Sequence, residues 1–156
     1  MSSSDLSRRQ FLKYAAMTGA SVSGGLFLYG CAIDPVTGKK QLMMVSQQQE
    51  IGIDRQHSPF QFSADYGVCQ DTSVNTYVTD VGQKLLPMVH RPSMPYNFQC
   101  VNATYINAYA FPGGTIAVTR GILLELENEA QLAALLGHEL GHVNARHSAE
   151  QMSKGQ

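Results

Sequence analysis

NEAQLAALLGHELGHV, the stretch from Asn128 to Val143, decides how this chain folds and where its chemistry lies. Asn128 is a favoured N-cap residue and Gln131 follows three positions later, so the pattern predicts that a helix begins here. Apolar residues within the stretch can anchor that helix to a core, namely Leu132, Leu135, Leu136 and Val143. The polar residues His138, Glu139 and His142 are therefore expected to lie on a helix.

The spacing of the two histidines suits a single metal ion. Residues i and i+4 of a helix lie on one face about one turn apart, so the imidazoles of His138 and His142 can reach the same ion. Glu139 is displaced by roughly 100° around the axis, so it can approach an activated water molecule without binding the metal. We interpret the histidines as zinc ligands and Glu139 as the base that removes a proton from water. A polar helix face that carries the motif by chance is the alternative.

A catalytic zinc site has three protein ligands and an open position, and the third ligand is not evident in this sequence. An extended metzincin motif would need glycine and histidine where Ala145 and Ser148 stand. His57 and His90 have no partner at useful spacing, and we treat both as ordinary residues. We expect a third ligand beyond Gln156, so that the chain holds only the N-terminal part of its domain.

Three charged or ionisable residues follow the motif closely in sequence. His147 is expected to point to the opposite side of the helix, as a surface or packing residue rather than a ligand. Glu150 lies about 18 Å from His138 along a continuous helix, too far to share an ion. Arg146 is predicted either to make a hydrogen bond behind the ligands or to be a solvated surface residue.

Two helices are predicted before the motif. Ser46 and Gln49 have the form of a capping box, so a helix is expected to run from there into the low sixties. Residues 71–73 can cap a second helix, which ends before the proline-containing loop 91–95. Its apolar face is defined by residues at three- and four-residue spacing, namely Val74, Tyr77, Val78, Val81 and Leu85.

Strands are predicted between these helices and the motif. Residues 96–100 alternate apolar and polar side chains, which is typical of a half-buried strand. Runs 105–111 and 115–119 are β-prone and flank Pro112-Gly113-Gly114, a hairpin turn. A short helix over 122–126 follows. We therefore expect an α+β domain in which a small antiparallel sheet precedes the motif helix.

The first thirty residues have the pattern of an export signal. Arg8 and Arg9 are followed by Phe-Leu-Lys and then by a mildly apolar run, which resembles the twin-arginine export motif. A permanent anchor is the alternative, but the run is short for a membrane span. Residues 28–31 resemble a lipoprotein cleavage box, which predicts lipidation of Cys31 and outer-membrane sorting of the exported domain. An ordinary cleavage site with an incidental cysteine remains the other reading.

Charge and cysteine content narrow the class of protein. The formal net charge is −1 at pH 7, which gives no electrostatic reason to expect nucleic acid as a partner. Cys69 and Cys100 lie in the exported part, where a disulfide can persist. The sequence leaves open whether they are bonded or are two buried thiols.

Several motifs together resemble the family of HtpX and the CAAX prenyl proteases, and most closely its soluble exported branch. They are residues 107–114, 118–121, 127–130 and 136–142 with Arg146 and His147, and an N-terminal segment at 35–42. The resemblance implies a zincin-like fold and a zinc endopeptidase of the cell envelope that acts on unfolded or misassembled proteins. It also implies a third ligand on a later helix, a glutamate. In that family the strand before the metal helix borders the cleft, so Asn107, Ala108, Tyr109 and Ala110 are candidate substrate-binding residues.

A second reading keeps the fold without the cleavage reaction. In it the chain is a lipid-anchored chaperone or scaffold that binds unfolded protein. An integral membrane peptidase is disfavoured, because nothing beyond residue 33 is apolar enough to span a bilayer.

Overall fold

The computed structural model of the chain describes residues 31–33, 36, 38 and 40–154. The predicted signal peptide, residues 1–30, lies outside these residues. An antiparallel hairpin comes first, formed by β1 (Cys31–Ile33) and β2 (Lys40–Leu42). In the part of the chain so described, no helix is both long and apolar enough to cross a bilayer.

The two helices predicted upstream of the motif are present. α2 spans Gln47–Ala64 and begins with a reciprocal capping box between Ser46 and Gln49. α3 spans Thr72–Leu85, and its N-cap Asp71 accepts a hydrogen bond from the Ser73 amide. A short 3-10 helix, η1 (Leu86–Met88), follows. Local capping signals therefore located both helix starts correctly.

The main sheet is mixed, and the prediction of an antiparallel sheet is wrong for one of its two pairings. Its strands are β3 (Asn97–Val101), β4 (Ala108–Ala110) and β5 (Thr115–Thr119), in the order β3-β5-β4. β4 and β5 form the predicted antiparallel hairpin, but β5 pairs with β3 in parallel. All five residues of β5 are buried, so the strand with the least exposed surface takes the centre and β4 becomes an edge.

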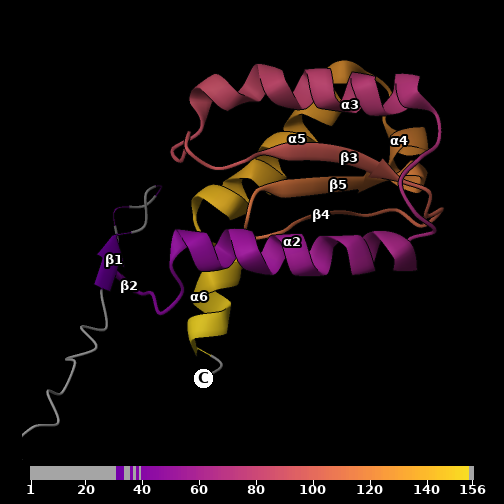
Figure 1. Cartoon of the computed structure of the whole chain (residues 1–156). Coiled ribbons are helices and arrows are strands. Elements are labelled where there is room, and N and C mark those ends of the chain that lie inside the picture. The colour runs from indigo at the N-terminus through magenta and orange to yellow at the C-terminus, as the bar shows by residue number, and fades with distance from the viewer. Residues whose placement is uncertain (1–30, 34–35, 37, 39, 155–156) are drawn as a thin grey trace, which may run out of the picture.

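Helices then enclose the sheet, as Figure 1 shows. α4 (Arg120–Glu125) follows β5, α5 (Glu129–Asn144) carries the motif, and α6 (His147–Lys154) ends the described chain. α3 lies along β3, and α5 packs against α3 and β4. One core joins them and contains Val78, Val81, Phe98, Cys100, Ile116, Val118, Leu132, Leu136 and Leu140. The expected α+β class is confirmed.

One glycine is required by close packing at the start of α4. A Cβ atom built on Gly121 would stand 2.2 Å from the carbonyl oxygen of Thr104, and its own amide donates to Ala103. We expect Gly121→Ala to lower the free energy of unfolding by about 1–3 kcal/mol, since backbone must move to make room. Gly52→Ala in α2 is the matched control, because a Cβ atom built on Gly52 would meet nothing within 4 Å. It should raise stability by up to about 1 kcal/mol. Urea denaturation of both variants tests the contrast.

Candidate active site

One face of the motif helix α5 packs into the core, and another face carries the two motif histidines. Asn128 caps α5 by accepting a hydrogen bond from the Gln131 amide at 3.0 Å. Leu132, Leu136 and Leu140 follow at four-residue intervals and are all buried in the core. His138 is exposed and His142 is partly exposed. The two imidazoles lie on one face of the helix, as the sequence predicted, and helical periodicity turns them away from the core.

The two imidazoles converge through the same ring nitrogen. Their Nε2 atoms lie 3.1 Å apart, and the ring centroids are separated by 4.7 Å. Two nitrogens that share a tetrahedral zinc ion at about 2.0–2.1 Å stand about 3.3 Å from each other. The observed separation is close to that value. The donor set and its spacing therefore fit one zinc ion.

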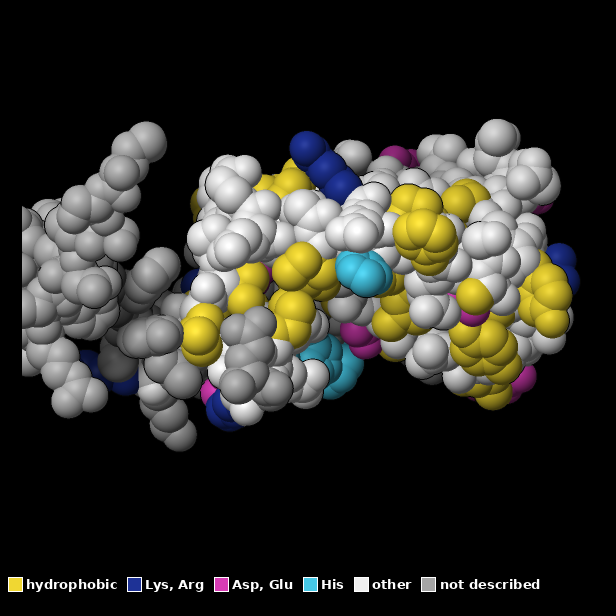
Figure 2. Space-filling view, turned by 60° about the horizontal axis from the view of Figure 1, so that its bottom comes forward, with side chains coloured by type: hydrophobic (Ala, Val, Ile, Leu, Met, Phe, Trp, Pro, Cys, Tyr) yellow, Lys and Arg dark blue, Asp and Glu magenta, His cyan; other side chains and the backbone are white. Residues whose placement is uncertain are grey.

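Glu139, which lies between the two motif histidines in sequence, is buried. It is only 8% exposed, and within the described part of the chain no residue donates a hydrogen bond to its carboxylate. It lines a cleft of about 280 Å³ together with His142, His147 and strand β4. Figure 2 shows that histidine side chains reach the surface of the molecule. A buried carboxylate without a partner is costly, so its presence in a cleft indicates a functional group.

β4 forms the wall of this cleft and is the edge of the sheet. The backbone of Asn107 is already bonded to Thr119, and the Phe111 amide is bonded to Thr115. Because hydrogen-bonded positions alternate in an antiparallel pair, Tyr109 also points its backbone groups toward β5. The backbone groups of Ala108 and Ala110 therefore face the open edge. Of the four predicted substrate-binding residues, these two have the backbone orientation that strand addition needs.

A buried carboxylate at the end of α2 holds β4 in place. Asp65 accepts hydrogen bonds from the hydroxyls of Tyr105 at 2.6 Å and Tyr109 at 2.5 Å, and from Gln61 at 3.2 Å. Burial alone would raise the pKa of this carboxyl, but the three hydrogen bonds together outweigh it and lower the pKa. Burial and the same carboxylate raise the pKa of Tyr109. Sequence reasoning missed this cluster, since its members are 40 and 44 residues apart.

Arg146 takes neither role that the sequence suggested. Its guanidinium bonds to Glu50 at 3.2 and 3.0 Å and to the Val45 carbonyl at 2.6 Å. Glu50 is 1% exposed and also binds Arg91 at 2.6 Å. The Arg146 side chain is 13% exposed and bonds to neither motif histidine in the described part of the chain, but fixes the turn that follows α5. No local signal could have found a partner 96 positions away.

The prediction for His147 was half wrong. The residue is exposed, as expected, but it does not point away from the motif. α5 ends at Asn144, and Arg146 has a φ of +57°, so the chain turns before α6 begins at His147. The Nδ1 atoms of His147 and His142 lie 2.8 Å apart. The expectation failed because it assumed one continuous helix, whereas α5 and α6 are two helices.

The remaining candidate site residues are the cysteines and any further metal ligands. In the described ranges, no three histidine, cysteine or acidic side chains are grouped so that they could hold a metal. Cys69 and Cys100 are free thiols, although the Cys69 amide donates to the Cys100 carbonyl at 2.8 Å. Burial, reinforced by Cys69, raises the pKa of the Cys100 thiol to about 12. Cys31 lies at the start of β1.

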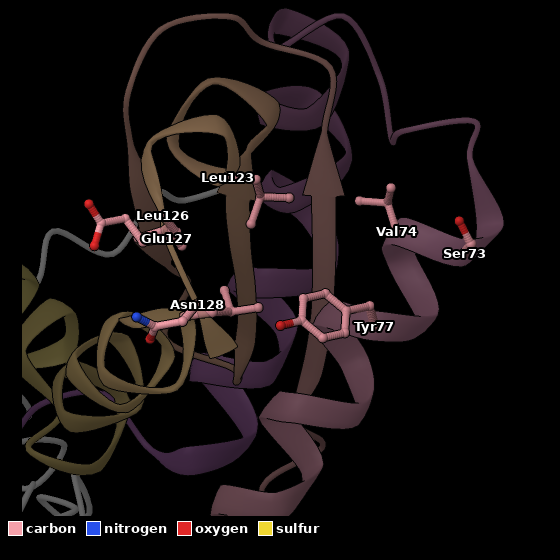
Figure 3. A pocket seen from close by; sticks show the side chains of 8 residues that line it. Ser73, Val74, Tyr77, Leu123, Leu126, Glu127 and Asn128 are labelled. Carbon is pink, nitrogen blue, oxygen red and sulfur yellow. The ribbon is translucent and has the colours of Figure 1, made fainter. Parts of the chain in front are cut away.

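A second hollow, of about 410 Å³, lies away from this chemistry. Figure 3 shows it between α3 and the junction of α4 with α5. Its lining includes Tyr77, Leu123 and Asn128 but neither motif histidine nor Glu139. It is therefore separate from the candidate active site.

Two imidazoles one turn apart on a helix, with a buried glutamate between them, are the arrangement of the HExxH metallopeptidases. The comparison of sequences agrees with this class. The chain belongs to peptidase family M48, whose profile matches residues 72–156. This confirms the predicted resemblance. A twin-arginine translocation signal sequence matches residues 5–25, which confirms the predicted type of export signal.

Several curated proteins are similar to this chain. The beta-barrel assembly-enhancing protease of Yersinia pestis is 32% identical over 96 residues, which cover 62% of this chain and 20% of that protein. The protein of the same name from Escherichia coli strain K12 is 27% identical over 123 residues, covering 79% and 25%. A mitochondrial metalloendopeptidase of Schizosaccharomyces pombe is 28% identical over 140 residues, covering 86% and 41%. The chain thus spans less than half the length of each of these relatives.

The Asp65 cluster predicts a specific dependence of stability on pH. Because the pKa of Asp65 is lowered by folding, its stabilising effect is complete above the unfolded pKa of about 3.9. That effect is lost as the pH falls through the lower pKa of the folded state. We expect Asp65→Asn to cost about 1–3 kcal/mol at neutral pH and to flatten the loss of stability in acid. The exposed Asp80→Asn variant is the control. Equal acid dependence of wild type and Asp65→Asn would contradict the assignment.

Proposed function

We propose that the protein is a zinc-dependent endopeptidase of the cell envelope. The observation that carries this proposal is the buried carboxylate of Glu139, which no described residue pairs with, next to a histidine pair whose Nε2 atoms are 3.1 Å apart. A structural carboxylate in such a position would have a hydrogen-bond partner. Family M48 membership supports the same activity.

Each residue has a defined role in peptide hydrolysis. His138 and His142 would hold a zinc ion through Nε2. The bound ion would supply Lewis acidity, which lowers the pKa of water and polarises the scissile carbonyl. Glu139 takes the proton from the attacking water and delivers it to the leaving amine. Ala108 and Ala110 pair with the backbone of an extended substrate along the edge of β4.

We further propose where the enzyme works and on what. The twin-arginine signal at residues 5–25 supports export, and lipidation of Cys31 would then hold the domain at the outer membrane from the periplasmic side. Two of the relatives are named beta-barrel assembly-enhancing proteases. We infer that the substrates are unfolded or misassembled envelope proteins. We also infer that each chain of the enzyme binds one zinc ion.

Glu139→Gln tests the catalytic role directly. The variant keeps both histidines and the size of the side chain but cannot accept a proton. We expect cleavage of an unfolded protein such as reduced, alkylated casein to fall by about 10²–10⁴-fold, with the zinc content unchanged. The full polypeptide that contains residues 31–156 should be used, with metal measured by atomic absorption.

The matched control is Glu125→Gln, which neutralises an exposed glutamate at the end of α4 and should retain activity. Cleavage by Glu139→Gln at the wild-type rate would reject the proposed mechanism. If the wild type binds zinc and casein but cleaves nothing, the chaperone or scaffold alternative replaces the endopeptidase.

Cys31→Ser tests the anchor. An acylated protein partitions with membranes, because each buried methylene of the chain contributes about 0.8 kcal/mol. We expect the wild type in the membrane fraction and Cys31→Ser in the soluble periplasmic fraction. Cys69→Ser should fractionate like the wild type. A membrane-bound Cys31→Ser protein would show that the signal is retained as an anchor instead.

A further inference from the structure

His147 contacts the metal ligand His142 from a different helix. The two rings have centroids 4.9 Å apart at an interplanar angle of 69°, and their Nδ1 atoms lie 2.8 Å apart. His142 belongs to α5 and His147 is the first residue of α6. The contact therefore depends on the turn between the helices and not on helical spacing.

The two nitrogens of the His142 ring face different partners. Nε2 faces His138, and Nδ1 faces His147. An ion held between the Nε2 atoms of His138 and His142 is thus approached by His147 only through the far side of the His142 ring. In this arrangement His147 is not a third ligand of that ion.

The direction of the hydrogen bond between His142 and His147 follows from which nitrogen carries a proton. An imidazole that binds a metal through Nε2 carries its proton on Nδ1. Two Nδ1 atoms at 2.8 Å can share one proton only. His142 therefore donates its Nδ1–H, and His147 accepts at Nδ1 while its own proton is on Nε2.

The surrounding structure fixes His147 in this place. Arg146 adopts a left-handed φ of +57° that turns the chain back toward α5, and its side chain is held by the buried Glu50. On α6, the Ser153 hydroxyl donates to the Ala149 carbonyl and accepts from the Met44 amide at 3.0 Å. The turn before α6 is therefore anchored through Arg146, and the last turn of α6 is anchored through Ser153.

We propose that His147 is a positioning residue that orients the zinc ligand His142 by accepting its Nδ1–H. The inference rests on the proposed function, because it needs His142 to bind the metal. Such a partner fixes the tautomer and the ring orientation of a ligand, and its loss typically weakens metal binding by about 10–100-fold.

The experiment compares zinc dissociation constants of the full polypeptide, measured by competition with a chromophoric chelator. His147→Ala should weaken zinc binding by about 10–100-fold. His147→Asn should recover most of that loss, because the asparagine side-chain oxygen takes the position of the histidine Nδ1. His57→Ala is the control, since it removes an exposed histidine from α2 and should leave the affinity unchanged.

A second readout is independent of affinity. In nitrogen-15 NMR of the zinc-loaded protein, the Nδ1–H of His142 should be visible in the wild type and in His147→Asn, and lost to exchange in His147→Ala. Unchanged affinity and an unchanged N–H signal in His147→Ala would overturn the inference, as would failure of His147→Asn to recover binding. A wild type that binds no zinc would instead overturn the proposed function.

Discussion

The site depends on the burial of one face of α5. Leu132, Leu136 and Leu140 fill the core between α3 and the sheet, and each buried leucine contributes roughly 1.5–3 kcal/mol. Because they recur every four residues, they fix the rotation of the helix about its axis. That rotation turns His138 and His142 outward and places Glu139 against β4, where the carboxylate is buried but reaches a cleft. The apolar face thus sets the direction of every group in the motif.

A second constraint acts where α5 ends. Glu50 lies between Arg91 and Arg146, and all three side chains are largely removed from water. Charges are costly to bury, so such a cluster is weak evidence for stability as such. Its geometric effect is clearer. Arg91 also donates to the Val143 carbonyl at 2.9 Å, so the cluster ties α2, the loop after α3 and the last turn of α5 together. The left-handed residue Arg146 and the return of His147 to the motif follow from that connection.

Features set by residues close together in the sequence were predicted correctly, whereas features set by residues far apart in the sequence were missed. Ser46, Asp71 and Asn128 were found as caps because a cap involves neighbours in sequence. The parallel pairing of β3 with β5 was missed because alternation predicts a strand but not its partner. His147 was misplaced because the break at Arg146 is held by Glu50, 96 positions away. The Asp65 cluster was missed for the same reason, since its tyrosine partners are 40 and 44 positions away.

These long-range contacts bear on how the proposed enzyme would choose its substrates. Asp65 accepts hydrogen bonds from Tyr109 in β4 and from Tyr105 in the loop before it, while the backbone groups of Ala108 and Ala110 face the open edge. The methyl side chains of Ala108 and Ala110 are too small to discriminate between substrate side chains. Affinity along this edge would therefore come from backbone hydrogen bonds, which every extended peptide can make. A folded protein has few strands free to pair, whereas an unfolded one has many. In the proposed enzyme, an edge of this kind next to Glu139 would select unfolded chains by their backbone and not by their sequence, which is the discrimination that a quality-control peptidase requires.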